Sequence, residues 1–253
     1  MLNAIILAGD KEDGHNVFET NKALLPINGK PMIEYIIKAL RMTPYVGKIA
    51  VVGPVDKLKT VIGDKVDFLV EQGDSMLDNA DRGIRLFRND EHVLILTSDI
   101  PMITPKAIED FILQSEALKA DFCYPVVRKE VNEKKFPGAK RTYVRLKDGV
   151  FTGGNIIYIS PAVFERCKDF ATKLIEFRKE PIKTARLLGT ALLIKLVLGK
   201  ATIAEIERRF DDILDITAKA VISAYPEIGN DVDKPDDVET VSKHFSQHEP
   251  MTI

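Results

Sequence analysis

Short apolar runs alternate with amphipathic stretches along the first hundred residues. Each run is four to eight residues long and ends at glycine or polar residues, which is typical of buried strands (roughly this length is usual for strands). The stretches between them repeat apolar residues with the period of a helix. This alternation predicts a three-layer α/β/α, Rossmann-like domain with a mostly parallel sheet. The expected strands are 3–8, 48–52, 66–70 and 92–97, and the expected helices are 31–42, 55–62 and 75–88.

The rest of the chain continues the pattern with more helix. Residues 181–213 are strongly helical, and Thr202 and Glu205 predict a capping box at the start of the last helix of this stretch. We therefore expect one domain over residues 1–245, a helical insertion near residues 162–215, and a flexible tail over 246–253. The other expected helices are 105–118, 161–177 and 235–245; the other expected strands are 121–127, 142–145, 155–159 and 217–223, with 142–145 and 155–159 around the turn at Asp148-Gly149; and the charged segment 128–141 is expected to form a basic surface hairpin or flap.

Composition and charge narrow the class of protein. The chain has 253 residues, of which 45% are hydrophobic and 29% charged, and its net charge is −2, so no overall field indicates nucleic acid or an anionic membrane. Cys123 and Cys167 are far apart and form no CxxC pair, which argues against a zinc site or a disulfide framework. The longest apolar run, 187–198, contains a lysine and is too short to cross a bilayer. We expect a cytoplasmic protein with no membrane span.

The first thirty residues contain the clearest chemical pattern. A buried strand runs into Gly9-Asp10, a polar loop follows, and Lys22 stands in the segment 21–31, which is expected to open a helix. A strand, a loop with glycine at its mouth and a lysine returning to the carboxyl end of the strand is how α/β proteins hold a nucleoside triphosphate. The loop amides face the phosphates, and the lysine supplies a compact positive charge.

Four later segments follow this opening in a familiar order: Gln72-Gly73-Asp74-Ser75, Thr97-Ser98-Asp99-Ile100-Pro101, Thr152-Gly153-Gly154-Asn155 and 231–237 (DVDKPDD). Together they resemble the nucleotidyltransferases of the MobA-like type, which belong to a wider superfamily of sugar-phosphate, methylerythritol and inositol-phosphate nucleotidyltransferases. The resemblance covers most of the chain and is weakest over 162–222. It implies a fold of the nucleotide-diphospho-sugar transferase type. It also implies magnesium-dependent transfer of NMP from a nucleoside triphosphate to a phosphorylated small-molecule acceptor, with release of pyrophosphate.

Two distant carboxylates are the expected metal ligands. Asp99 follows an apolar strand and should project at the edge of the sheet, and by resemblance Asp233 reaches the metal beside it. Asp231 could point inward instead, because alternate residues of an extended segment share a face. Oxygen ligands of this kind suit Mg²⁺ or Mn²⁺. The alternative interpretation is that both aspartates only cap the helices that follow them, as Asp236 and Asp237 are expected to do.

The resemblance also assigns residues to the nucleotide. Lys22 would contact the α-phosphate and, with Asp99, form the catalytic pair. Ser75 corresponds to a base- and ribose-contacting turn, although capping of the helix over 75–88 explains it equally well. The residues expected to bind the nucleotide are Ala8, Gly9, Lys11, Lys22, Gln72, Gly73 and Ser75.

The chain departs from the family pattern in the phosphate loop. Asp10 stands where the family has a second glycine, and no arginine occurs between Gly9 and Lys22. Lys11 would have to replace that arginine as a point charge. Two alternatives therefore stay open: a nucleotide-binding module with weak or no turnover, and a nucleotide-sugar glycosyltransferase of similar architecture, which would need no lysine in this loop.

The acceptor side is less specific. Gly154 and Asn155 precede a strand and by resemblance lie under the acceptor, while a plain hairpin turn explains them as well. Lys183 and Arg186 could hold an acceptor phosphate. Helices 181–213, in which they occur, are more typical of an amphipathic cover over the acceptor side of the sheet or of a homodimer interface.

Overall fold

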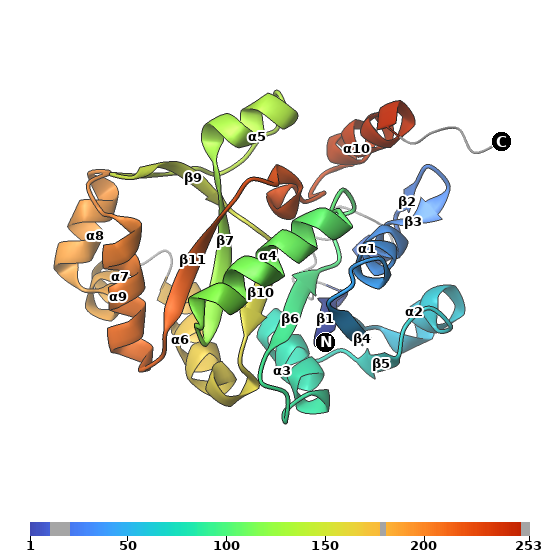
Figure 1. Cartoon of the computed structure of the whole chain (residues 1–253), viewed down its shortest axis with the longest axis horizontal. Helices are drawn as coiled ribbons and strands as arrows, with labels where there is room; N and C mark the ends of the chain where they lie inside the picture. The colour runs from blue at the N-terminus through green and yellow to red at the C-terminus, as the bar shows by residue number, and fades with distance from the viewer. Residues whose placement is uncertain (11–20, 178–180, 249–253) are drawn as a thin grey trace.

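A mixed sheet of nine strands with helices on both faces forms the body of the molecule (Figure 1). The structure is a computed structural model and describes residues 1–10, 21–177 and 181–248. The strands are β1 (Leu2–Leu7), β4 (Val46–Gly53), β5 (Phe68–Glu71), β6 (Val93–Thr97), β7 (Phe122–Arg128), β8 (Val144–Leu146), β9 (Gly149–Gly153), β10 (Ile156–Ile159) and β11 (Ala218–Ser223), and a separate hairpin holds β2 (Pro26–Ile27) and β3 (Lys30–Pro31). The helices are α1 (Met32–Arg41), α2 (Val55–Ile62), α3 (Met76–Leu86), α4 (Pro105–Leu118), α5 (Lys129–Lys135), α6 (Phe164–Phe177), α7 (Pro181–Leu188), α8 (Thr190–Val197), α9 (Ile203–Leu214) and α10 (Pro235–His248), with short 3-10 turns η1 (Lys22–Leu24), η2 (Pro161–Val163) and η3 (Pro226–Gly229).

The strand order explains where ligands can approach. Strands β5, β4, β1 and β6 lie side by side and parallel, so their carboxyl ends share one edge of the sheet. The chain then inserts β10 antiparallel between β6 and β7, and β11 pairs with β7 in parallel. The expected α/β fold is confirmed, with a sheet that is parallel in its first half and mixed in its second.

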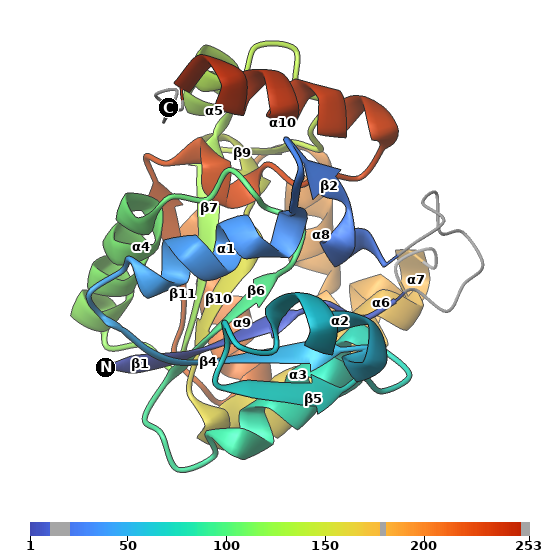
Figure 2. The same ribbon diagram turned by 90° about the vertical axis from the view of Figure 1, so that its right-hand side faces the viewer.

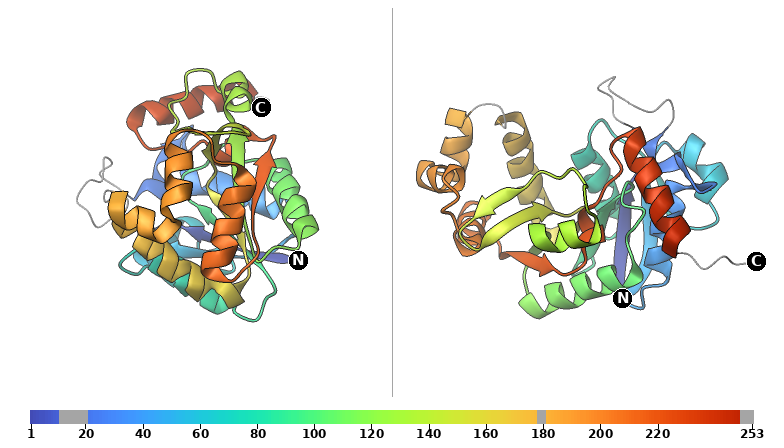
Figure 3. Two further views of the ribbon diagram at one scale, coloured as in Figure 1. Left: turned by 90° about the vertical axis from the view of Figure 1, so that its left-hand side faces the viewer. Right: turned by 90° about the horizontal axis from the view of Figure 1, so that it is seen from above.

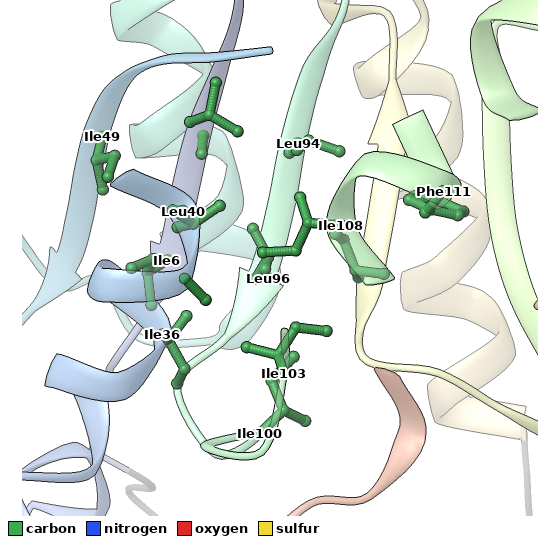
Figure 4. Packing of buried hydrophobic residues seen from close by; sticks show 14 of the residues in the cluster. Ile6, Ile36, Leu40, Ile49, Leu94, Leu96, Ile100, Ile103, Ile108 and Phe111 are labelled. Carbon is green, nitrogen blue, oxygen red and sulfur yellow. The ribbon is translucent and has the colours of Figure 1, made fainter. Parts of the chain in front are cut away.

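Alternate side chains of the central strands point into two separate hydrophobic cores, one on each face of the sheet. Ile6 of β1 and Leu96 of β6 face α1 and α4, where they meet Ile36 and Ile108 (Figure 4). Ile5, the neighbour of Ile6, belongs to the opposite core with α3 and α6. Because β1 is covered on both faces, it must be apolar throughout, and that is how its sequence reads.

Two smaller apolar clusters attach the peripheral helices. One joins β2 and α1 to α10 and to Phe136, which directly follows α5. In this cluster the rings of Tyr35 and Phe245 stack with centroids 4.5 Å apart. Figure 2 shows α10 and α5 together above this side of the sheet. The other cluster packs α8 and α9 against the β8–β9 hairpin through Leu146 and Phe151. Of the helical insertion, α6 covers one face of the sheet beside α3, whereas α8 and α9 lie at the end of the sheet opposite α2 (Figure 3).

The segment after the phosphate loop differs from the sequence prediction. Lys22 lies in the 3-10 turn η1, and the β2–β3 hairpin separates it from α1, which begins only at Met32. Asn28 and Gly29 at the tip of that hairpin both have positive φ, 47° and 78°. An Asn-Gly pair in a two-residue turn is a strong hairpin signal, which the sequence analysis missed.

The second half contains three further corrections. The charged segment 128–141 begins with helix α5, because its Glu and Lys residues are good helix formers. The turn at Asp148-Gly149 joins β8 to β9, a strand that was not predicted, whereas the predicted strand at 155–159 is β10 and returns to the middle of the sheet. Helix α10 extends to His248, into the expected tail, and residues 249–253 lie outside the described residues. The predicted capping box of Thr202 and Glu205 is confirmed.

Candidate functional site

The carboxyl ends of β1 and β6 meet at one point of the sheet edge. Leu7 pairs with Thr97 in the register, and the Ser98 amide donates to the Leu7 carbonyl at 3.1 Å, so Asp99 follows directly beside the end of β1. The amide of Val232 donates to the Asp99 carbonyl at 2.8 Å and ties the C-terminal segment to the same point. Val232 is fully buried, so its neighbours on either side turn toward Asp99.

Lys22 connects the carboxylates of Asp99 and Asp233. Its Nζ lies 2.6 Å from Oδ2 of Asp99 and 2.9 Å from Oδ1 of Asp233. The turn that carries Lys22 is fixed by Asn21, which is 1% exposed, caps η1 by accepting from the Ala23 amide, and donates to the Ala8 carbonyl at 2.9 Å. The Lys22 ammonium is therefore held between the strand-end aspartate and the C-terminal segment.

The surroundings of Lys22 keep it charged. Partial burial disfavours the ammonium, but the negative charges and hydrogen bonds of Asp99 and Asp233 outweigh that effect and raise the pKa of Lys22 above its usual value. Lys22 is therefore protonated at every pH at which the protein would work.

Asp231 completes a group of three carboxylates. Asp99, Asp231 and Asp233 each offer one oxygen within 4.8 Å of the others. The Thr97 hydroxyl donates to Oδ1 of Asp99 at 2.5 Å, and Arg141 donates to Asp231. Octahedral Mg²⁺ with oxygens at about 2.1 Å holds its ligand oxygens about 3 to 4 Å apart. Small side-chain rotations would bring the three oxygens within that range, so the donor set fits a hard divalent cation.

The predicted nucleotide side is built from backbone amides and two amide side chains. The Asp10 amide donates to Oε1 of Gln72 at 2.8 Å, and the Gly73 amide donates to Oδ1 of Asn79 at 2.7 Å. A Cβ at Gly9 would lie 2.3 Å from Nδ2 of Asn79, so a larger residue would have to displace that side chain. The hydroxyl of Ser75 accepts from the Asp78 amide at 3.1 Å, so the capping interpretation of this serine is confirmed.

The unusual Asp10 is neutralised within the structure. Its carboxylate accepts from Nζ of Lys57 at 2.8 Å and from Nδ2 of Asn21 at 2.7 Å. Its charge is therefore paired with a lysine of α2, which reduces the repulsion that an unpaired aspartate would exert on phosphates at this edge. Lys11, the predicted substitute for the missing arginine, lies outside the described residues.

The acceptor side has two buried donors without partners. Gly154 packs against Pro125 and Ile228, where a Cβ would lie 2.8 Å from the proline ring. Among the described residues, Nδ2 of Asn155 and Nε of Arg141 are buried and make no hydrogen bond. Continuing the β10–β6 register pairs Asn155 with Thr97, whose hydroxyl holds Asp99, so both side chains lie on the same face of the sheet. Buried donors without a partner are rare, and a water molecule or an oxygen of a ligand would satisfy these two.

The remaining predicted residues lie in the helical insertion. Lys183 has its Nζ 5.2 Å from the centroid of the Phe177 ring, and Arg186 is exposed on the same helix, α7. Their role at an acceptor stays a prediction. The contacts of Asn21, Thr97 and Arg141 were not predicted from the sequence. Of these three residues only Thr97, two residues before Asp99, had a local signal.

A family model described as the MobA-like NTP transferase domain matches residues 4–196. Among curated proteins, 8-amino-3,8-dideoxy-manno-octulosonate cytidylyltransferase of Shewanella woodyi is 30% identical over 118 residues, which are 45% of this chain and 48% of that protein. The enzyme of the same name from Shewanella frigidimarina is 29% identical over 119 residues. The chain thus spans about half the length of the curated relatives it matches.

Solved structures resemble the whole chain. A hypothetical transferase from Thermus thermophilus is 36% identical, with a TM-score of 0.81 over 94% of this chain and 99% of that one. A CMP:2-keto-3-deoxy-manno-octonic acid synthetase complexed with CTP is 14% identical with a TM-score of 0.63, covering 98% of this chain and 99% of that one. The 4-diphosphocytidyl-2C-methyl-D-erythritol synthase of Anaerococcus prevotii is 11% identical with a TM-score of 0.60, over 97% and 96%. The last two likenesses concern the fold alone.

Proposed function

The chain belongs to the MobA-like NTP transferase domain family, and we propose that it is a nucleotidyltransferase that transfers NMP from a nucleoside triphosphate to an anionic small-molecule acceptor, with release of pyrophosphate. The observation that carries this proposal is the convergence of Lys22 with Asp99 and Asp233 at the carboxyl edge of the sheet. Ligands of open α/β sheets bind at this edge.

The proposed reaction is an in-line displacement at the α-phosphorus. An acceptor oxygen forms a bond to phosphorus while the bond to the pyrophosphate oxygen breaks. Lys22 would place its ammonium on the α-phosphate, where negative charge develops. The turns at Gly9 and Gly73 would let the nucleotide approach the backbone closely, and Gln72 and Asn79 fix those turns by accepting from the Asp10 and Gly73 amides. Asp99 and Asp233, with Asp231 near them, would hold Mg²⁺ or Mn²⁺, which when bound neutralises phosphate charge as a Lewis acid.

CTP is the first nucleotide to test, because the curated relatives are named cytidylyltransferases. The acceptor is proposed to be anionic because the Arg141 guanidinium donates to the Gly153 carbonyl at 3.4 Å, and both Arg141 and Asn155 have a buried donor without a partner. An oxygen of a phosphate or a carboxylate would suit either donor. Sugar phosphates, polyol phosphates and 3-deoxy sugar acids are therefore the acceptor classes to screen.

The direct test is a matrix of the four nucleoside triphosphates against these acceptors, with Mg²⁺ present and pyrophosphate release as the readout. Turnover with one pairing, absent without metal, supports the proposal. Thermal stabilisation by a triphosphate with Mg²⁺ but no pyrophosphate with any acceptor would instead favour a nucleotide-binding module. The missing loop arginine is the feature that keeps this second candidate in view. Release of nucleoside diphosphate from nucleotide sugars would indicate a glycosyltransferase.

A further inference from the structure

The space between Asp99 and Asp233 already contains a cation. The Lys22 ammonium bridges one oxygen of each carboxylate at 2.6 and 2.9 Å. The side chains of Lys22 and Asp99 are 19% and 18% exposed, whereas that of Asp233 is 56% exposed, so the bridge is open to water on the Asp233 side. The third carboxylate, Asp231, is paired with Arg141. Each of the three acids therefore has a basic partner from the protein itself.

A divalent ion coordinated by the same two oxygens cannot leave the ammonium where it is. An ion bound to both carboxylates lies about 2.1 Å from each oxygen, which places it in the region that Nζ of Lys22 now occupies. A second cation at that distance would be strongly repelled, because no water or salt ion fits between two charges so close together. Entry of an ion at these two oxygens therefore requires Lys22 to move.

We propose that Lys22 acts as an internal substitute for the metal: it occupies the cation position between Asp99 and Asp233 in the free protein and vacates it when the triphosphate attracts its ammonium. This inference rests on the proposed function and adds an order of events to it. The free protein binds the divalent ion weakly, and the nucleotide opens the position by offering Lys22 another anionic partner.

The two binding events are then coupled, and the coupling is reciprocal. The nucleotide improves binding of the ion because it removes a competing charge, and the ion improves binding of the nucleotide because it keeps Lys22 displaced. Asp99 does not have to reorganise, since Thr97 and the Val232 backbone hold it in either state. The largest rearrangement is therefore that of the Lys22 side chain, and Asp231 and Asp233 need only small rotations.

The test measures Mn²⁺ affinity of the nucleotide-free protein from the electron paramagnetic resonance signal of free Mn²⁺. Neutral substitutions, Lys22→Met and Lys22→Gln, should tighten Mn²⁺ binding about tenfold, within the range usual for such coupling. Lys22→Arg keeps the charge and should leave the affinity near that of the wild type. Lys65→Met is the matched control, because Lys65 pairs with Glu34 at 2.8 Å on another part of the surface.

Each outcome decides the inference. Tighter Mn²⁺ binding confined to the two neutral Lys22 variants supports it, whereas unchanged or weaker binding in both overturns it. Equal tightening by Lys65→Met would also overturn it, since the cause would then be net charge. Circular dichroism checks that each variant is folded. If one of the two neutral variants does not fold, the other still tests the inference. Pyrophosphate release by the wild type is assayed in parallel: turnover without tightening rejects only this inference, and tightening without turnover for any substrate rejects only the proposed function.

Discussion

Replacing Asp99 by asparagine separates chemistry from stability at this site. The asparagine keeps the size of the side chain. It also keeps two backbone hydrogen bonds, from the Ser98 amide to the Leu7 carbonyl and from the Val232 amide to the carbonyl of residue 99. It removes the negative charge that accepts from Lys22 at 2.6 Å and from Thr97 at 2.5 Å. The fold is therefore expected to persist while the metal site and the anchor of the lysine are lost.

The expected loss of stability and the expected loss of turnover differ greatly in size. A hydrogen bond to a charged partner is worth about 1.5–3 kcal/mol, which is the stabilisation that Lys22 loses. The substitution also removes repulsion from Asp231 and Asp233, whose oxygens lie within 4.8 Å, so the net change in the free energy of unfolding should stay below about 1 kcal/mol. Turnover should fall by about 10³-fold or more, because a preorganised charge at the reacting centre contributes on that scale.

The assay is pyrophosphate release under saturating substrates, with urea unfolding followed in the same preparations. Asp67→Asn is the matched control, because Asp67 accepts from the Ile49 amide and from Arg41, both at 2.8 Å, and takes no part in the site. That variant should lose about 1 kcal/mol of stability and no activity. Full activity in Asp99→Asn would refute the role of Asp99, and a loss of several kcal/mol would refute the charge argument.

Three further predictions use other parts of the structure. Gly9→Ala should raise the KM for the nucleoside triphosphate about tenfold without changing the KM for the acceptor, because the new Cβ lies 2.3 Å from Asn79 and displaces that side chain. A nucleotide KM equal to that of the wild type would contradict this prediction. Arg141→Met should raise the acceptor KM about tenfold and leave the nucleotide KM unchanged, which steady-state kinetics with each substrate varied will show. The pKa of Asp67 is lowered, since the bonds from an amide and a guanidinium outweigh burial, so its stabilisation is present above pH 3.8 and disappears as pH falls through the lower folded pKa. Urea unfolding from pH 6 to 2 should therefore lose less stability in Asp67→Asn than in the wild type.

The alternating first half of the chain was predictable because burial on both faces leaves each strand as a short apolar run. Helices α2 and α4 begin and end at the predicted residues, and Pro105 behind Thr104 marks the start of α4. The approach of Lys22 to Asp99 was also predictable, because both follow strands whose carboxyl ends must share one edge. Such inferences need only local pattern and sheet topology.

Contacts made by charged residues at a distance could not be predicted in the same way. Lys57 lies on an exposed helix, and nothing near it in the sequence indicates that it pairs with Asp10. Arg141 was one of several basic residues in a charged segment, and only the return of the chain through α5 places it against Asp231. Partner choice among exposed ions depends on tertiary geometry, and any of several lysines or arginines would suit the local pattern equally.

Asp10, which stands where the family pattern has a second glycine, should disturb the proposed site less than its charge alone suggests, because that charge is paired. An aspartate in place of glycine would oppose a triphosphate if its charge were free, but Asp10 is bound to Lys57 and Asn21, and its amide is engaged by Gln72. Because the same Asn21 also caps the turn that carries Lys22, the substitution adds a contact to the support of the lysine. The effect of Asp10 should therefore fall on nucleotide affinity, whereas Lys22 and Asp99, on which the proposed chemistry depends, keep their arrangement.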